Sequence, residues 1–283
     1  MAAYSDKIKR VCDYIQQHLD DVLTVEQLGA VAALSKYHFH RLFVSFTGIN
    51  LMKFIQLSRL KRASFQLAFE PELKIIDIAL RAGFDSPEAF SRAFKRVFDQ
   101  TPTAFRKAPD WGNWHSKFDF SLPAGELTMD VTIIAAAEEK IAYISHRGAP
   151  DRVLDTTAKF IAWRKATGLS PIKSSRTYGI PYADSKTVAA EDFRFDICGS
   201  IDGEVPANDY GVVSGVIPAG RCAVFGHKGS HEGIEDSVYH LYRNWLPQSG
   251  EEAREFPVYF HYLNFIHEVG EGELLTDIYL PLK

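Results

Sequence analysis

The sequence predicts a multidomain protein, with an all-α N-terminal domain that holds two helix-turn-helix units and an α+β C-terminal domain built as a tandem strand-helix-strand-strand repeat. Three observations support this fold class. A short helical motif with a polar outer face occurs twice in the N-terminal third, strand-like alternation begins only beyond residue 120, and the alternating segments also repeat. The chain has 283 residues, 46% of them apolar, which is enough to bury two hydrophobic cores.

The helical motif reads SKYHFHRLFVSF at residues 35–46 and SPEAFSRAFKRVF at residues 86–98. Each copy begins with a serine, whose hydroxyl can accept a hydrogen bond from a free backbone N–H of the first helical turn. The second copy has Pro87 at the first helical position, where the missing N–H has no cost. Apolar residues then recur every three or four positions on one face, and the opposite face carries Arg, Lys, Ser and His.

Each copy follows a shorter helical segment, at residues 24–34 and 74–82. A helix, a turn of a few residues and a second helix with a polar face form a helix-turn-helix, in which the second helix enters the major groove of DNA. Two amphipathic helices of an ordinary bundle are the alternative interpretation. Because the whole unit occurs twice on one chain, the sequence favours DNA binding.

The run GFDSPEAFSRAFK at residues 83–95, with Thr101-Pro102 and Phe105-Arg106 after it, is highly specific. On these residues, and on Phe39, Arg41 and Phe43 in the first copy, residues 8–107 resemble the DNA-binding domain of the AraC/XylS family of transcription regulators. The resemblance implies double-stranded DNA as a partner and, as for AraC-type activators, RNA polymerase. The residues that it places at the DNA are Tyr37, His40 and Arg41, then Pro87, Glu88, Ser91 and Arg92, with Lys95 and Arg96 beside them.

Between the two units, Asn50 is expected to cap a long helix that continues to Phe69. At 1.5 Å per residue this helix is roughly 28 Å long, a span that could hold two recognition helices near one DNA turn, about 34 Å, apart. Basic residues around it are expected to contact phosphates, with an ordinary solvated role as the alternative. They are Lys53, Arg59, Lys61, Arg62, Arg96, Arg106 and Lys107.

The charge distribution agrees with this division of the chain. The net charge is −4, yet residues 1–110 hold 16 Lys and Arg against 12 Asp and Glu, whereas residues 111–283 hold 16 against 24. A basic N-terminal part suits a domain that meets phosphates, and an acidic C-terminal part suits one that does not.

Membrane, secreted and metal-dependent classes are not indicated. No apolar run approaches the roughly 18 residues of a membrane span, and the N-terminus lacks a signal-peptide core. The three cysteines, Cys12, Cys198 and Cys222, lie too far apart for a zinc motif and are odd in number. We therefore expect buried thiols in a cytoplasmic protein with no metal and no cofactor.

The stretch APDWGNWHSK combines Pro, Gly and two Trp without periodicity and is interpreted as a linker. The predicted domains are thus 1–107 for DNA binding, 108–117 for the linker and 118–283 for the second domain. The two tryptophans are expected to anchor the linker to one domain rather than to stack on a ligand.

Beyond the linker, alternating segments predict β-strands. They are residues 127–134, 140–145, 177–182, 193–197, 212–217, 222–227, 258–263 and 275–280, with helices at 151–166 and 233–245. A shift of 81 residues aligns AYISHRGAPDRVLD with AVFGHKGSHEGIED, and it places His146 on His227. We expect one sheet with both helices on one face, and histidines that end a strand rather than form a catalytic pair.

The repeat, WLPQSG at residues 245–250 and IYLPL at residues 278–282 resemble the GyrI-like small-molecule-binding domain over roughly residues 127–283. Members that bind lipophilic cations are expected to carry a Glu in a P-x-aromatic-E-x-Y pattern, where this chain has Phe260. The resemblance therefore implies an apolar, aromatic pocket in place of a cation site. Its predicted lining is Trp163, Tyr178, Trp245, Phe260 and Tyr262. A filled core without a ligand is the alternative.

The sequence thus predicts a sequence-specific DNA-binding transcriptional regulator of the AraC/XylS type, which responds to a small apolar or aromatic effector in the GyrI-like domain. Two alternatives stay open. One is a hydrolase of reactive small molecules, although Phe260 removes the obvious general base and favours a protein that is not an enzyme. The other is a DNA-binding protein whose C-terminal domain only mediates protein interactions.

Overall fold

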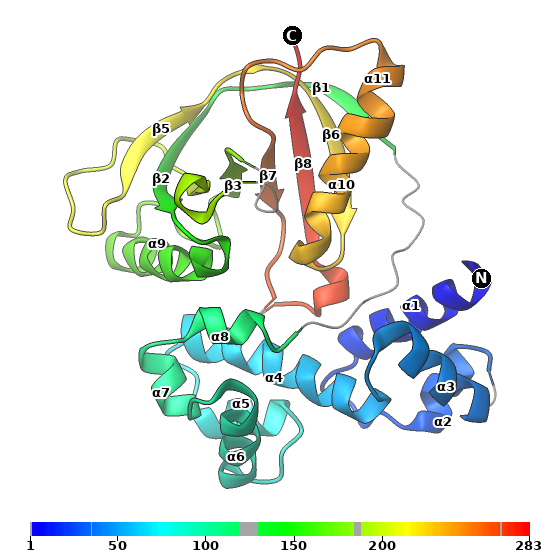
Figure 1. Ribbon diagram of the computed structural model, residues 1–283. Coiled ribbons are helices and arrows are strands. Elements are labelled where there is room, and N and C mark those ends of the chain that lie inside the picture. Colours follow the sequence, from blue (N-terminus) through cyan, green and yellow to red (C-terminus); the bar gives the residue numbers. More distant parts are fainter. Residues whose placement is uncertain (1, 35, 119–129, 184–187, 267) are drawn as a thin grey trace. The chain divides into compact units, whose positions relative to one another are not determined.

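The structure is a computed structural model that describes residues 2–34, 36–118, 130–183, 188–266 and 268–283 (Figure 1). The chain divides into two compact units. The helical unit contains Met1–Leu127 together with Ile266–Leu274, and the sheet unit contains Thr128–Phe265 together with Leu275–Lys283. This differs from the continuous second domain, 118–283, expected from the sequence, because a short C-terminal segment packs within the helical unit.

The helical unit is built around one long central helix, α4 (Figure 1). Its 19 residues give a length of roughly 28 Å at 1.5 Å per residue. One helix-turn-helix precedes α4 in the chain and the other follows it. The helices are α1 (Ala2–Gln17), α2 (Val25–Val31), α3 (Lys36–Thr47), α4 (Leu51–Phe69), α5 (Ile75–Arg81), α6 (Pro87–Phe98), α7 (Pro102–Lys107) and α8 (Trp111–His115).

Side-chain caps fix where these helices begin. The Asn50 side chain accepts the backbone N–H of Lys53 at 2.9 Å, and Ser86 accepts that of Ala89 at 3.2 Å. Each cap satisfies one of the donors that a helix N-terminus leaves without an intrahelical partner. Both predicted starts are confirmed, whereas the predicted cap at Ser35 lies outside the described residues.

Aromatic side chains form the cores of the two helix-turn-helix units. Phe39 and Phe43 of α3 are fully buried, and the Phe43 ring meets that of Phe54 edge to face, 5.4 Å between centroids. In the second unit Phe90 and Phe94 of α6 are fully buried in the same way. Aromatic pairs of this geometry add to the free energy gained from burial alone, so the inner face of each recognition helix is held rigidly.

Arg59 of α4 contacts both the loop before α2 and the turn before α6. Its guanidinium donates to the carbonyl oxygens of Leu19 and Asp21 at 2.8 and 2.7 Å, in the loop before α2. The same guanidinium lies against Gly83 in the turn before α6, where a Cβ would be 2.5 Å from Nη1. Gly83 has φ +76°, a conformation that glycine adopts without strain. One side chain thus contacts both the loop that leads into the first helix-turn-helix and the turn inside the second.

The predicted linker is a helix of the helical unit. Trp111 and Trp114 of α8 are buried, and the indole N–H of Trp114 donates to the Ser64 hydroxyl at 2.7 Å. The Trp111 ring stacks on that of Phe69, with 5.7 Å between centroids. The expectation that the tryptophans anchor this stretch to one domain is confirmed, but the stretch is ordered and helical.

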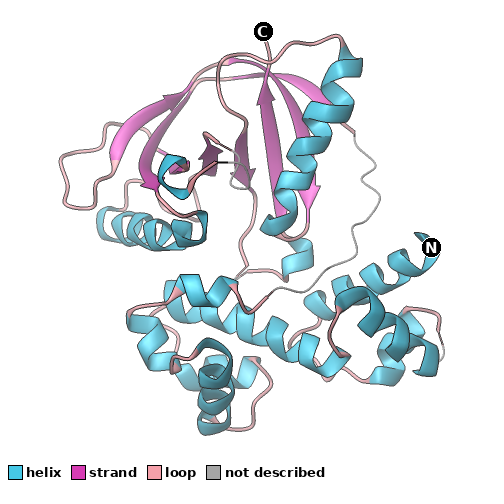
Figure 2. Ribbon diagram, viewed as in Figure 1, coloured by secondary structure: helices cyan, strands magenta, loops and turns pink. Residues whose placement is uncertain are grey.

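In the described part of the sheet unit, eight strands form one antiparallel sheet in the order β1-β6-β8-β7-β3-β4-β2-β5 (Figure 2). The single sheet is confirmed, and each of the eight predicted strands overlaps an observed one, although residues 127–129 of the first predicted strand lie outside the described residues. The repeat-equivalent strands β3 and β7 pair at its centre. The strands are β1 (Thr132–Ala136), β2 (Glu139–Arg147), β3 (Thr177–Pro181), β4 (Arg194–Ser200), β5 (Val213–Ile217), β6 (Gly220–Lys228), β7 (Tyr259–Tyr262) and β8 (Leu275–Pro281).

The helices of the two repeats cover the same face of the sheet, as predicted. Trp163 of the first repeat packs in one cluster with Ile144, and Leu241 of the second packs in another with Phe225. The row of paired residues across this face is Ile144, Ile197, Gly179, Phe260, Ile278 and Phe225. The helices are α9 (Val153–Thr167), α10 (Ile234–His240), which continues as a π turn (Leu241–Trp245), and α11 (Leu246–Ser249).

The two equivalent histidines stand at matching corners. His146 at the end of β2 has the Thr156 hydroxyl 2.9 Å from Nδ1 and the Ala149 carbonyl 3.0 Å from Nε2. His227 has partners 81 residues further on at the same distances. A carbonyl only accepts, so Nε2 must donate and Nδ1 accepts from the hydroxyl. Each ring therefore joins a strand end to its helix, as predicted.

The remaining class expectations concern cysteines and membrane spans. Cys12, Cys198 and Cys222 are buried free thiols, and burial raises the pKa of Cys12 to about 12. Among the helices of the described residues, none has the length and apolar character needed to cross a membrane.

The contact between Arg59 and Gly83 leads to a prediction about stability. Gly83→Ala should lower the free energy of unfolding by about 1–2 kcal/mol for the left-handed backbone, and by about 1 kcal/mol more because Arg59 must give up a hydrogen bond. Gly48→Ala is the matched control, since Gly48 has φ +75° and a Cβ added there would have no described atom within 4 Å. Urea unfolding measures both, and equal losses would show that the Arg59 contact contributes nothing.

Candidate nucleic-acid interface and ligand groove

Helix α6 has one buried face and one exposed polar face. Phe90, Phe94 and Phe98 are buried in the core of the helical unit. The exposed residues are Glu88, Arg92, Lys95 and Arg96, with Ser91 half-buried among them. The structure therefore brings five of the six second-unit residues that were predicted at the DNA onto one helix face, while half-buried Pro87 begins the helix. Their contacts with DNA stay a prediction.

The cations of this face are available for an external partner. Within the described residues, no ion pair joins Arg92, Lys95 or Arg96 to a carboxylate of the chain. The carboxylate of Asp99, just past the helix, instead lies 3.6 Å from the ammonium of Lys117. An arginine without an internal partner can donate two hydrogen bonds to a guanine edge.

Helix α3 has the same arrangement where its side chains are described. Phe39 and Phe43 point into the core, and Arg41 is exposed. The side chains of Tyr37 and His40 lie outside the described part of the structure, so their predicted role at the bases is untested. Together, α3 and α6 offer two recognition helices from one helical unit.

The predicted phosphate contacts fall into two groups. Lys53, Arg96 and Lys107 are exposed and keep this role as a prediction. Lys61 does not, because it is 5% exposed and its ammonium lies 2.8 Å from Glu271 Oε1. The prediction for Lys61 is wrong, since a buried ammonium engaged by a carboxylate cannot reach a phosphate.

The other three arginines of that set are engaged within the protein. Arg59 donates to two backbone carbonyls, as described above, and Arg106 donates to the Leu73 carbonyl at 2.7 Å. Arg62 pairs with Asp20 at 2.5 Å. These three side chains hold loops against helices. The prediction that they contact phosphates is therefore wrong, and their role is to position other parts of the protein.

Aromatic side chains cluster along the seam between β3 and β7, where the sequence predicts a ligand pocket, and we call this cluster the candidate groove. Phe260 and Tyr262 of β7 lie on the helix-covered face, and Phe260 pairs with Gly179 of β3. A Cβ on Gly179 would be 2.5 Å from the Phe195 ring and 2.7 Å from the Tyr262 hydroxyl. Because Gly179 has no side chain, these two rings meet directly above the strand.

Phe195 connects the two halves of this groove, since it packs against the apolar cluster of each repeat. The sequence interpretation missed it as a lining residue. The alternation of Phe193, Phe195 and Ile197 could have identified it, because Ile197 lies on the helix-covered face and residues two apart share a face.

The structure brings together three of the five residues predicted to line the pocket. Trp245, Phe260 and Tyr262 pack in one cluster. Trp163 belongs to α9 and is fully buried in the neighbouring cluster. Tyr178 lies on the opposite face, because it is adjacent to Gly179 and successive strand residues point to opposite faces. Tyr178 is therefore removed from the groove.

The groove is apolar and its one hydroxyl stays protonated. Burial is the main reason that the pKa of Tyr262 is raised above its usual value, so the phenol remains a neutral donor. The His231 ring lies 4.9 Å from that of Tyr262. Phe260, at the position where a cation-binding groove is expected to have a carboxylate, is 7% exposed.

The opposite face of the sheet holds a polar network that the sequence interpretation did not anticipate. The Tyr178 hydroxyl donates to Glu139 at 3.1 Å, and Arg176 also bonds this carboxylate. The His261 ring lies 5.0 Å from that of Tyr178. Burial, with the charge of Arg176, lowers the pKa of His261 to about 4, so this imidazole is neutral at pH 7.

The described residues contain no cluster of three His, Cys, Asp or Glu side chains arranged to hold a metal ion. The two candidate surfaces thus consist of a basic helix face on α6 and an apolar, aromatic cluster on the sheet.

Two recognition helices on one helical scaffold, joined to a two-repeat sheet with an aromatic groove, define a DNA-binding transcriptional regulator of the AraC type. A helix-turn-helix domain model matches residues 28–108, and the model of the GyrI-like small molecule binding domain matches residues 129–283. The second match covers more than half of the chain, and the chain belongs to the GyrI-like family.

Named relatives resemble one half of the chain or the other. The probable transcriptional regulator YgiV of Escherichia coli K12 is 46% identical over 156 residues, which are 55% of this chain and 98% of that protein. The right origin-binding protein of Escherichia coli K12 is 35% identical over 122 residues, 43% of this chain and 41% of that protein. The DNA-binding domain of AdpA, solved with a target DNA, is 31% identical and has a TM-score of 0.34. The match covers 36% of this chain and 90% of the AdpA chain.

The exposed face of α6 leads to a prediction about DNA recognition. Arg92→Ala should weaken binding to a selected duplex by about 1–3 kcal/mol and leave a scrambled duplex nearly unaffected, because a lost guanine contact removes discrimination. Lys107→Ala should weaken both duplexes alike and flatten the salt dependence by about one unit, as a phosphate contact does. Anisotropy titrations over a salt series measure both. Equal losses on the two duplexes from Arg92→Ala would assign Arg92 to phosphate.

Proposed function

We propose that the protein regulates transcription as a monomer on an asymmetric DNA site, and that a neutral apolar or aromatic effector bound in the groove modulates it. The proposal rests on the presence of two features in one chain: exposed cations on α6, and the phenyl ring of Phe260 in the candidate groove. The first suits a phosphate polymer with base readout, and the second suits a ligand without charge.

The DNA part of the proposal follows from both recognition helices lying in one helical unit. Successive major grooves on one side of the duplex are about 10 base pairs apart, so two helices on one scaffold cover a site of about 20 base pairs. Selection from random DNA with the full-length protein identifies the site. Sedimentation of the complex then gives its stoichiometry, and a palindrome bound only by a dimer contradicts the proposal.

The effector part follows from the cost of burying charge. A lone cation in an apolar groove loses several kcal/mol of hydration free energy, whereas a cation–π contact with Phe260 returns about 2 kcal/mol. A neutral aromatic molecule avoids that loss and gains about 25 cal/mol for each Å² of apolar surface buried. We therefore assign the groove to neutral ligands.

A hydrolytic function is the second candidate, and the arrangement of groups weighs against it. A hydrolase needs a general base near the substrate, and the position of the expected carboxylate is occupied by Phe260. Both ring nitrogens of His146 and of His227 are engaged in structural hydrogen bonds. We propose a binding protein rather than an enzyme, acting in the cytoplasm on DNA and RNA polymerase.

A sheet unit that only mediates protein interactions is the third candidate. Thermal unfolding of the full chain with a series of neutral aromatic compounds separates it from an effector domain. A ligand at 100 times its dissociation constant adds about 2.7 kcal/mol to the free energy of unfolding. A series that produces no stabilisation favours the interaction role.

Replacement of Phe260 leads to a prediction about ligand preference. Phe260→Glu should reverse the preference, so that the full-length protein gains affinity for quaternary-ammonium aromatics and loses it for matched neutral ones, because a buried carboxylate needs a counter-charge. Phe260→Leu is the control, since it keeps the groove apolar and should retain neutral ligands. Calorimetric titration of the three proteins measures this. Tight cation binding by the native chain would show that another acidic group supplies the charge.

A further inference from the structure

A segment between β7 and β8 leaves the sheet and packs within the helical unit. We call residues 268–274 the docking segment. Two hydrogen bonds join the two ends of this connection. The Leu263 N–H donates to the Leu275 carbonyl at 3.0 Å, and the Asn264 side chain accepts from the Leu275 N–H at 2.8 Å. Since β8 begins at Leu275, the docking segment is joined to a central strand without any intervening residue.

The backbone of the docking segment lies directly on α1. A Cβ on Gly270 would be 2.2 Å from the Gln16 carbonyl oxygen, and one on Gly272 would be 3.6 Å from the Asp13 Cα. At Gly270 there is no space for any side chain, so only glycine allows this approach. Leu274, which ends the segment, is 1% exposed.

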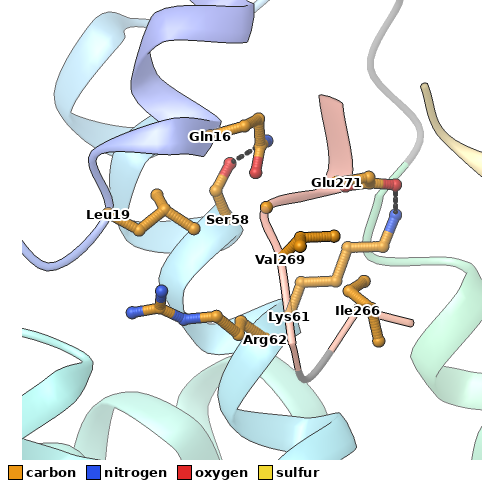
Figure 3. Close-up of a pocket in the computed structure, with 9 residues that line it drawn as sticks. Gln16, Leu19, Ser58, Lys61, Arg62, Ile266, Val269 and Glu271 are labelled. Atoms are coloured by element: carbon orange, nitrogen blue, oxygen red, sulfur yellow. Dashed lines mark hydrogen bonds and ion pairs between the residues drawn. The ribbon is translucent and has the colours of Figure 1, made fainter. Parts of the chain in front are cut away.

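A buried ion pair holds the docking segment to α4. The ammonium of Lys61 lies 2.8 Å from Glu271 Oε1, with both side chains buried (Figure 3). The same ammonium lies 4.9 Å from the centre of the Phe118 ring and 5.6 Å from that of Trp114. Lys61 is thereby stabilised by a carboxylate from the docking segment and by two aromatic faces of the helical unit.

The small cavity beside this pair is not a ligand site. It is lined by Gln16, Ser58, Lys61 and Glu271, among others (Figure 3), and at about 10 Å³ it has room for about one water molecule. The neighbouring Gln16 side chain is already bonded to the Ser58 hydroxyl at 3.0 Å. The docking segment therefore serves as a structural contact and not as the wall of a binding pocket.

An ion pair is well suited to a contact that must open and close. Its Coulomb energy in the docked state is offset by the hydration that both charges regain when they separate. Two such states of similar free energy can be shifted by a ligand that prefers one of them. An apolar anchor of the same size would expose its surface to water on release and would favour the docked state throughout.

We propose that the Lys61–Glu271 pair couples the effector groove to the DNA-binding helices. Ile278 of β8 packs in the same cluster as Phe260, four residues after the docking segment ends at Leu274. A ligand that displaces this cluster moves β8 and pulls on the docking segment, which bears on α4. Because Arg59 of α4 holds the loop before α2 and lies against the turn before α6, a shift of α4 alters the placement of both helix-turn-helix units. This inference rests on the proposed function.

The test measures DNA affinity of the full-length protein on a selected duplex, with and without saturating Nile red as a neutral aromatic probe. The native chain should change its DNA dissociation constant at least fivefold with the dye, the lower end of typical allosteric coupling. Glu271→Gln should reduce this factor to below twofold, while DNA and dye affinities measured separately change less than threefold. Glu252→Gln is the matched control, because Glu252 pairs with Lys283 on the exposed surface, and it should keep the native factor.

A reversible lock gives a second readout that does not depend on weakening the pair. In Asp13→Cys combined with Gly272→Cys, the Cβ added at residue 272 would lie 3.6 Å from the Cα of residue 13, so the two Cα atoms are closer than the roughly 7 Å limit for a disulfide. Buried Cys12, whose pKa is raised to about 12, stays unreactive. The oxidised protein should lose the dependence of DNA affinity on dye, and reduction should restore it.

The outcomes separate the coupling from the proposed function. If the native chain binds DNA and dye but shows no coupling, or if Glu271→Gln and the oxidised lock keep the native factor, the coupling proposal is overturned and the proposed function stands. If the native chain binds neither selected DNA nor any neutral aromatic compound, the proposed function fails and the coupling fails with it.

Discussion

The helical unit depends on hydrogen bonds and ion pairs that satisfy the polar side chains of α4, a helix with most of its residues buried. Helix α4 carries Ser58, Arg59, Lys61 and Ser64 toward its neighbours, and a buried polar group without a partner costs free energy comparable to a lost hydrogen bond. Each of these groups finds its partner in a different segment: α1, the loop before α2, the docking segment and α8. Directional hydrogen bonds, as well as apolar contacts, therefore fix these four segments around α4. The positions of the two recognition helices depend on α4 in turn.

Local signals in the sequence were sufficient for most elements of this fold, although α8 was predicted as a linker. The caps at Asn50 and Ser86, the glycine turn at Gly83 and the alternation of the strands act within a few residues, so they can be identified without knowledge of the partners. The repeat at 81 residues also predicted the equivalent histidine corners and the single sheet. For the candidate site, the same periodicity placed Arg92 and its neighbours on one exposed face and Phe260 and Tyr262 on one side of the sheet.

What the sequence could not provide were contacts whose two halves lie far apart. Lys61 was expected at the surface because lysine is almost never fully buried, and its partner Glu271 is 210 residues away. The docking segment reads as an ordinary polar loop, since nothing in its composition distinguishes docking on α1 from exposure to water. Tyr178 was assigned to the groove by residue type alone, and the register with β7 was needed to place it on the other face.

The sheet unit shows how a symmetric repeat acquires an asymmetric site. In the first repeat the buried carboxylate of Asp196 is bonded by Ser145 and Arg194. The equivalent positions around Asp277 are Gly226 and Leu275, which offer no side-chain donor, and burial raises the pKa of Asp277. On the helix-covered face the same divergence sets Gly179 opposite Phe260, so that one repeat contributes an aromatic floor and the other contributes space. Duplication supplies the scaffold, and the substitutions between its copies determine what the groove can bind.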